Sequence, residues 1–262
     1  GATAGRTTLN GEGLQHEDGH SHLLSATIPN CISYDPCFSY ELAVIIQNGL
    51  ERMIKNQEDV FYYITIMNEN YTHPEMPKNI NEDIIKGIYK YSENKAKGPK
   101  VQLMGSGVIL REVIEAGNIL EKDFNVSSSI FSVTSFTEVR RNALDIQRWN
   151  MLNPDKTEKK STLDEIIIDL ESPIITATDY MKSFAEQIAT FLPNKFISLG
   201  TDGFGRSDSR EALRDFFEVD RNHIVIAALK ALTEKQEIEK SVLLSAIKKY
   251  KIMNDKPNPV SL

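Results

Sequence analysis

The sequence lacks the features that mark several classes of protein. Two cysteines among 262 residues, Cys31 and Cys37, are too few for a disulfide framework, which favours a reducing compartment such as the cytoplasm. No run of about 18 uncharged apolar residues occurs, so the sequence predicts no membrane-spanning segment. Acidic residues outnumber basic ones, and the formal charge of −7 argues against nucleic acid or an anionic membrane as the main partner.

The sequence also lacks an initiator methionine and a targeting segment. It begins Gly1-Ala2-Thr3-Ala4-Gly5, without the basic and apolar regions of a signal peptide. We therefore expect either the remnant of a tag or a piece of a longer protein.

The residues that are present predict an α/β protein. A hydrophobic fraction of 40% at this length is enough for one large or two modest domains. A strand over 28–34, an amphipathic helix over 38–55 and a strand over 60–66 form a βαβ unit, which implies parallel strands. Residues 68–100 are polar and interrupted by prolines, so they predict a linker, with a short strand at 87–91 and a domain boundary.

Strands and helices continue to alternate along the rest of the chain. Ser135 and Glu138 have the spacing of a helix-capping box, and residues 150–170 are expected to form an exposed polar excursion. The predicted strands are 100–104, 129–133, 174–178 and 196–199. The predicted helices are 108–123, 135–149, 179–191, 209–217, 221–235 and 239–250. This order is typical of an α/β fold.

Residues 1–27 are rich in Gly, His, Ser and Thr, predict a loop, and hold three of the five histidines at positions 16, 20 and 22. Histidine titrates near neutral pH, so the cluster suits proton transfer or the stabilisation of an anion. A metal site is the rival interpretation, although no Pro-Cys-x-x-Cys and no His-Glu-x-x-His accompanies the cluster. A polar surface loop is the third.

Two glycine-rich turns offer weaker signals. Gly105-Ser106-Gly107 could hold an anion, but Leu110 leaves the dinucleotide fingerprint incomplete, so a tight turn is favoured. Residues 200–210 carry Arg206 and Arg210, which could receive a carboxylate or phosphate, or the stretch could simply cap the next helix. Remaining residues of interest are expected to be structural or inert, namely Cys31, Cys37, His73, Trp149 and His223.

Several stretches together resemble a known family. Residues 5–22 read GRTTLNGEGLQHEDGHSH, and further matches are TIPNCISYDP (27–36), SVTSFTE (132–138), RWNML (148–152), TDYMK (178–182) and residues 200–211. They resemble the homodimeric bacterial type of the thiamine-diphosphate-dependent, decarboxylating component of the pyruvate dehydrogenase complex, within the transketolase-like superfamily. The likeness covers essentially the whole chain.

The resemblance implies a fold and a set of site residues. Residues 1–78 are expected to be the last part of a pyrimidine-binding middle domain, and residues 79–262 a transketolase-like C-terminal domain with a mostly parallel sheet. Glu12 and His16 are expected to be catalytic, near the thiazolium and the substrate. His20 and His22 are expected to bind substrate at its entrance or to support the loop. The family leaves open whether Arg206 and Arg210 face a carboxylate or a subunit interface.

The resemblance also implies an activity. The family decarboxylates pyruvate with thiamine diphosphate and Mg²⁺ and acetylates the lipoyl groups of the acyltransferase core, with active sites formed in a homodimer. The Gly-Asp-Gly motif that holds the cofactor is absent from this sequence. No cofactor-binding or metal residue is therefore expected here, and the 262-residue chain alone is expected to be folded but inactive.

Two alternatives remain. One is a non-catalytic dimerisation or assembly domain. The other is transketolase-like sugar transfer, which is disfavoured because transketolases have Pro-Thr before the last histidine of the Glu-Asp-Gly-x-x-His element, where this chain has His20-Ser21 before His22.

Overall fold

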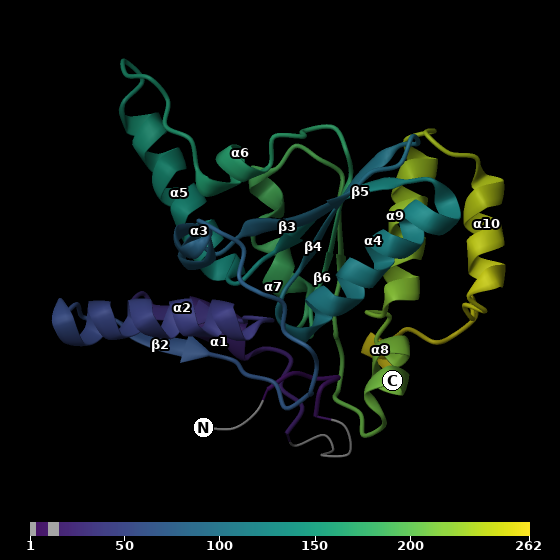
Figure 1. Cartoon of the computed structure of the whole chain (residues 1–262), viewed down its shortest axis with the longest axis horizontal. Helices are drawn as coiled ribbons and strands as arrows, with labels where there is room; N and C mark the ends of the chain where they lie inside the picture. Colours follow the sequence, from purple (N-terminus) through teal and green to yellow (C-terminus); the bar gives the residue numbers. More distant parts are fainter. Residues whose placement is uncertain (1–3, 10–15) are drawn as a thin grey trace.

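The computed structural model describes residues 4–9 and 16–262 and contains two β-sheets surrounded by helices (Figure 1). The first sheet has two parallel strands, β1 (Cys31–Tyr34) and β2 (Phe61–Ile64). The second has the order β3-β5-β4-β6-β7. Its strands are β3 (Tyr89–Asn94), β4 (Lys100–Gly105), β5 (Ser127–Ser132), β6 (Ile174–Ala177) and β7 (Phe196–Leu199). Only the β3–β5 pair of these sheets is antiparallel, so the predicted α/β fold with mostly parallel strands is confirmed.

The predicted βαβ unit is confirmed in the first sheet. Its helix is α2 (Ser39–Leu50), which continues as the π-helical turn η1 (Glu51–Lys55). The fully buried Glu41 fixes the start of α2, because its carboxylate accepts the backbone N–H of Cys37 at 2.6 Å and of Phe38 at 2.9 Å. Figure 1 shows this unit as a layer below the five-stranded sheet.

Helices cover both faces of the five-stranded sheet (Figure 1). Strand residues alternate between the faces: Leu103 packs in the apolar cluster that includes α4 (Leu110–Phe124) and α9 (Arg221–Glu234). Met104 packs in the second cluster, with α5 (Phe136–Leu152) and α7 (Lys182–Glu186). The core of the molecule therefore lies on both sides of β4.

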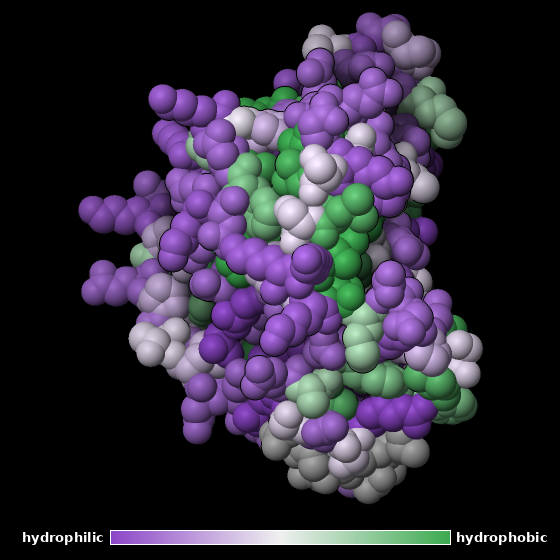
Figure 2. Space-filling view, turned by 90° about the vertical axis from the view of Figure 1, so that its right-hand side faces the viewer, coloured by the Kyte–Doolittle hydropathy of each residue, from purple (hydrophilic) through white to green (hydrophobic). Residues whose placement is uncertain are grey.

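The outer helix α10 (Lys240–Lys249) packs on α9 rather than on the sheet. Figure 2 looks onto this side of the molecule and shows a mainly hydrophilic surface with a band of apolar residues between the polar ones. The remaining helical segments are α1 (Ser21–Ala26), α3 (Asn81–Lys86), α6 (Thr162–Ile166), α8 (Arg210–Phe216) and the 3₁₀ turns η2 (Gly107–Ile109), η3 (Ala189–Phe191) and η4 (Pro259–Ser261).

Three sequence predictions are wrong in detail. The predicted loop over 1–27 contains the helix α1, which Asp18 starts by accepting the N–H groups of His20 and Ser21, both at 3.0 Å. Within the predicted linker over 68–100 the helix α3 was not predicted, and the short strand predicted at 87–91 is part of a longer edge strand, β3, which pairs with β5. The helix predicted over 179–191 is shorter and is divided between α7 and η3. The domain boundary between residues 78 and 79 stays a prediction.

Candidate functional site

The histidine-rich segment runs from an exposed turn into a buried helix. His16 and His20 are exposed, whereas His22, in the first turn of α1, has no exposed surface. Glu12, the other residue predicted to be catalytic, lies outside the described residues. The structure therefore places two histidines at the surface and one in the interior, and the roles predicted for all four residues stay predictions.

His22 is enclosed by aromatic rings. Its imidazole stacks on Phe184 with a centroid distance of 4.6 Å, and it meets the rings of Tyr180 and Tyr63 edge-on at 4.7 and 5.3 Å. Burial lowers the pKa of His22 to about 3, so the imidazole is neutral at physiological pH. This environment supports the alternative in which His22 holds the loop in place.

A chain of buried hydrogen bonds leads from His22 to Asp35. The imidazole Nε2 lies 2.9 Å from Oγ1 of Thr65, whose hydroxyl donates to Asp35 at 2.7 Å. The other Asp35 oxygen accepts from Ser106 at 2.8 Å, and the Ser106 hydroxyl lies 3.0 Å from that of Thr178. When the Thr65 hydrogen is directed to Asp35, the tautomer of His22 that carries its hydrogen on Nε2 completes the chain.

This chain lies where strands of the two sheets end. Asp35 follows β1, Thr65 follows β2, Ser106 follows β4 and Thr178 follows β6. The carboxyl ends of parallel strands are the usual place for a ligand site in α/β proteins. Here the polar side chains at these ends bind one another, and burial raises the pKa of Asp35 to about 7.

The turn at Gly105-Ser106-Gly107 packs against Asp35 and binds it. The Gly107 N–H donates to the Asp35 carbonyl at 2.9 Å, and Gly107 has a φ of +50°. A Cβ at this position would lie 2.5 Å from the Asp35 carboxylate, so the close approach requires glycine. The turn therefore packs against a side chain of the protein itself.

Residues 4–9 are fixed by a second buried aspartate, Asp179. Its carboxylate accepts the Thr7 N–H at 2.9 Å and the Thr8 hydroxyl at 2.8 Å. Gly5, with a φ of +99°, lies so close that a Cβ there would collide with the same carboxylate. Burial raises the pKa of Asp179. The first described residues are thus held to the segment that follows β6.

The two arginines of the 200–210 stretch have partners inside the chain. Arg210 donates from Nε to the Thr8 carbonyl at 2.8 Å and from Nη2 to Asn68 at 3.2 Å. The Arg206 backbone N–H donates to the Glu17 carboxylate, and its guanidinium lies 5.7 Å from the Phe216 ring centroid. Both arginines therefore help to hold the loop and the first described residues.

A cavity of about 520 Å³ beside Arg210 is lined by an ion-pair network that was not predicted from the sequence. The buried Arg214 binds the Glu69 carboxylate and lies 3.7 Å from Glu112. Arg221 binds Glu112 through Nε at 2.8 Å and Nη2 at 3.0 Å. The only signal in the sequence was Glu112, an acidic residue next to the apolar positions of the helix predicted over 108–123.

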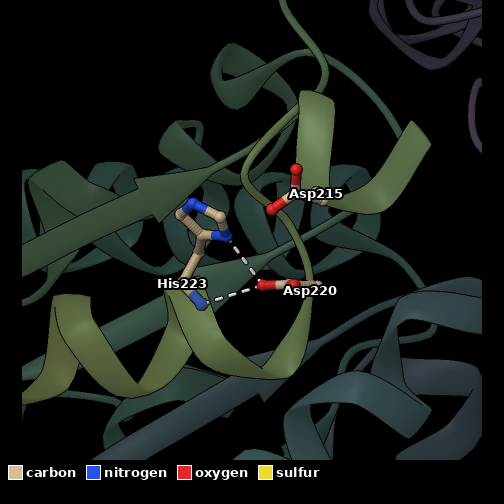
Figure 3. A group of neighbouring side chains, drawn as sticks. All are labelled: Asp215, Asp220 and His223. Atoms are coloured by element: carbon tan, nitrogen blue, oxygen red, sulfur yellow. Dashed lines mark hydrogen bonds and ion pairs between the residues drawn. The ribbon is translucent and has the colours of Figure 1, made fainter. Parts of the chain in front are cut away.

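Asp215, Asp220 and His223 form a further group of polar side chains (Figure 3), with one potential ligand atom from each within 4.8 Å of the others. Asp220 caps α9 by accepting the His223 N–H at 2.9 Å, and the same oxygen lies 2.7 Å from the His223 Nδ1. The helix N-terminus places partial positive charge beside these atoms, which disfavours a cation. We therefore assign the group to the cap of α9.

The cysteines have no feature of a reactive thiol, because burial raises the pKa of Cys31 and raises that of Cys37 well above its usual range. Within the described part of the chain, no helix is both long and apolar enough to cross a membrane.

Two family models match the chain. The model described as "Pyruvate dehydrogenase E1 component middle domain" matches residues 1–74. The model described as "Transketolase-like TK C-terminal domain" matches residues 87–220, about half of the chain.

Curated relatives extend the match to the full length of the chain. It is 54% identical to a "Pyruvate dehydrogenase E1 component" from Cupriavidus necator, over 100% of this chain and 30% of the relative. Proteins of the same name from Pseudomonas aeruginosa and Escherichia coli K12 are each 56% identical over 99% of the chain, and over 30% and 29% of their own length. The chain thus spans about 30% of the length of these relatives.

Solved structures with a similar fold are transketolases. The enzyme from Leishmania mexicana aligns with a TM-score of 0.64 at 14% identity, over 89% of this chain and 30% of the other. That from Campylobacter jejuni aligns with a TM-score of 0.63 at 16% identity, over 87% and 30%. At these identities the likeness is one of fold.

Proposed function

The chain belongs to the transketolase-like family, and we propose that it supplies the end of the middle domain and the C-terminal domain of a pyruvate dehydrogenase E1 component. The identity of 54–56% to E1 components, maintained over the whole chain, supports this assignment. In a polypeptide of the relatives' length, the chain would take part in the decarboxylation of pyruvate and the acetylation of lipoyl groups on the acyltransferase.

The observation that carries the proposal is the exposure of His16 beside the buried Glu17. Glu17 and Gly19 are buried, whereas the His16 side chain faces solvent. An accessible imidazole on a fixed loop can stabilise a developing negative charge, and it can donate a proton to the sulfur that leaves the lipoyl disulfide when the acetyl group is transferred. We propose His16 as this proton donor and Glu12 as a second catalytic residue. His20, also exposed, would lie at the entrance for the substrate.

The test uses a polypeptide of the relatives' full length that contains this chain. His16→Ala is expected to lower the rate of lipoyl acetylation from pyruvate by about 100-fold, the usual contribution of general acid catalysis. The exposed Arg148, replaced in Arg148→Met, is the control and is expected to leave the rate unchanged. An unchanged rate in His16→Ala would refute the proposed role, and no pyruvate turnover in the native polypeptide would refute the proposed function.

We propose that thiamine diphosphate and Mg²⁺ are held by other parts of such a polypeptide. Asp35 and Asp179, the buried aspartates at the sheet ends, accept hydrogen bonds from the chain itself with both of their oxygens. They therefore do not fit the role of Mg²⁺ ligands. The 262-residue chain alone is expected to show no pyruvate-dependent dye reduction, and measurable reduction by it would overturn this assignment.

The second candidate is an assembly role, in a homodimer or within the complex. Large apolar side chains are exposed along α2, η1 and β2: Leu50 at 54%, Ile54 at 67% and Phe61 at 43%. Leu50 and Ile54 lie one helical turn apart on the same side of the helix, and exposed apolar side chains placed in this way often mark a protein interface. Measuring the mass of Ile54→Asp in solution tests this role, because a loss of dimer would support it and an unchanged dimer would refute it.

A further inference from the structure

We propose that Arg6 is a positioning residue that fixes the loop carrying His16 against residues 200–206, an inference that rests on the proposed function for its catalytic consequence. Arg6 lies ten positions before His16 in the sequence. It belongs to none of the groups of residues that the sequence marks as chemically active. Its role follows from three sets of contacts.

The first is the set of acceptors that the guanidinium binds. Arg6 is 5% exposed, and its Nη1 donates to the main-chain carbonyls of Thr201 and Gly203, the latter at 2.6 Å. Its Nε donates to the carbonyl of Glu17 at 3.4 Å. One side chain thus joins the main chain of two loops that are more than 180 residues apart in sequence.

The second is the close packing of the guanidinium on the loop. A Cβ at Gly19 would collide with Cζ, Nε and Nη2 of Arg6, so the loop backbone lies directly against the guanidinium. On the other side, the Gly19 carbonyl accepts the N–H of Met181 at 2.8 Å. Residues 17–19 are therefore enclosed between Arg6 and the segment that follows β6.

The third is a contact in the opposite direction, from the loop to residues 200–206. The Glu17 side chain, 4% exposed, accepts the Arg206 N–H. A Cβ at Gly205 would lie 2.5 Å from Oε2 of Glu17, so the carboxylate fits against a backbone without a side chain. The two loops are therefore interlocked at Glu17, the residue that follows His16: Arg6 binds its carbonyl, and its carboxylate binds the Arg206 N–H.

This interlock has a catalytic consequence if His16 donates a proton. Proton transfer is efficient only when the donor is held within a fraction of an ångström of its productive position. Lysine cannot replace Arg6, because an ammonium lacks the planar fork that reaches two carbonyls of one loop and one of the other. Arg6 never needs to touch the substrate; it acts through the backbone of Glu17.

The structural part is tested by amide hydrogen exchange in the 262-residue chain. In Arg6→Lys, the amides of Arg206 and Met181, which are bonded to Glu17 and Gly19, are expected to exchange at least about 10-fold faster. The amides of β4, in the centre of the large sheet, are expected to keep their native rates, which shows that the variant is folded. Arg148→Met, which removes an exposed arginine on α5, is the control. Native exchange at both reporters in Arg6→Lys overturns the proposal.

The catalytic part is tested by a double-mutant cycle in the longer polypeptide. Arg6→Lys is expected to lower kcat for lipoyl acetylation about 10-fold to 100-fold with the KM for pyruvate within about two-fold. In the His16→Ala background the same change is expected to have an effect below about two-fold, because the residue that Arg6 positions is gone. An equal loss in both backgrounds would show that Arg6 acts on stability or elsewhere, and would overturn the proposal. If the native polypeptide does not turn over pyruvate, the proposed function fails, whereas the exchange experiment still decides whether Arg6 fixes the loop.

Discussion

We define the polar junction as residues 4–9, 16–20 and 200–206. It is largely buried, as is the five-stranded sheet, but different interactions stabilise the two regions. The buried side chains of β4 are mainly apolar: Val101, Leu103 and Met104 have no exposed surface, and Gln102 is the polar exception within this strand. In the polar junction, Arg6 and Glu17 are almost as inaccessible, yet their contacts are hydrogen bonds to the main chain.

This difference in interactions predicts which region of the protein tolerates substitution. Apolar contacts have no preferred direction, so a core accepts a side chain of similar volume. Buried hydrogen bonds and ion pairs do have a direction, and removing one partner leaves the other unsatisfied. We therefore expect the polar junction and its supporting side chains to be more sensitive to conservative substitution than the sheet, and also more sensitive to pH.

The largest expected contrast is between Arg214→Met and Leu103→Met. Arg214 donates to Thr7 in the polar junction and pairs with Glu69 and Glu112, so its loss removes one cation from each carboxylate and leaves Arg111 on Glu69 and Arg221 on Glu112. The expected cost is about 3 kcal/mol, the lower end of the range for breaking a buried ion pair. Leu103→Met keeps the apolar volume and is expected to cost less than about 1.5 kcal/mol. Urea unfolding followed by circular dichroism measures both, and equal costs would contradict the distinction.

The next effect depends on pH. The pKa of His22 is about 3 in the folded chain and near 6.5 in the unfolded one, so below pH 6.5 the unfolded chain takes up the proton and the native state loses stability as the pH falls. His22→Phe removes this loss. From pH 7 to pH 4, the unfolding free energy of the native chain is expected to fall by about 3 kcal/mol relative to that of the variant.

Comparing the two proteins at each pH is essential here. Asp35 and Glu17, whose pKa is raised to about 7, make the folded state bind more protons than the unfolded one between their usual range and pH 7, which gives the opposite slope. Both carboxyls are present in native chain and variant, so their contribution cancels. A difference that does not change with pH would show that His22 is not buried in its neutral form.

A smaller effect is expected for Thr65→Val, which keeps the shape of the side chain. The Thr65 hydroxyl links His22 to Asp35, so its removal leaves two buried polar groups each short of a partner. The expected cost is about 1–3 kcal/mol. Thr233→Val on α9 is the matched control, because its hydroxyl only bonds the Leu229 carbonyl of its own helix. Thermal unfolding of both variants tests whether the buried link matters more.

The smallest effect is expected at an exposed hydrogen bond next to the polar junction. Ser209 caps α8 by accepting the Ala212 N–H at 3.2 Å. Ser209→Ala is expected to cost about 0.5–1 kcal/mol, and Ser245→Ala, in the middle of α10, is expected to cost nothing. A Ser209→Ala cost as large as that of Thr65→Val would mean that burial does not set the difference.

Local patterns identified most of the elements. The strand β7 was predicted at its observed bounds, and Ser135 accepts the Glu138 N–H at the start of α5 as its spacing predicted. The reciprocal half of the capping box is replaced by a tertiary contact, because the Ser135 N–H donates to the Gly87 carbonyl at 3.0 Å while Glu138 pairs with Arg141 at 2.8 Å. The short strand predicted at 87–91 covers only the start of the edge strand β3, because the later residues are polar and the pairing with β5 supplies what their own pattern lacks.

The candidate site was likewise predicted only in part from the sequence. Its histidines were found because histidine titrates near neutral pH and three of them lie within seven residues. The network of Glu69, Glu112 and Arg214 was missed, because charged residues in a periodic pattern predict a solvated face, and only the fold shows that theirs is enclosed.

The sequence by itself determined the α/β class, the alternation of strands and helices and the family, because each of these depends on patterns within short stretches of chain. Only the tertiary structure decided which of three neighbouring histidines is buried and what fixes the loop that carries them. His16 and His22 are six residues apart, and nothing local distinguishes them. Their difference is set by Phe184, Thr65 and Arg6, and residues that distant meet only when the whole chain has folded.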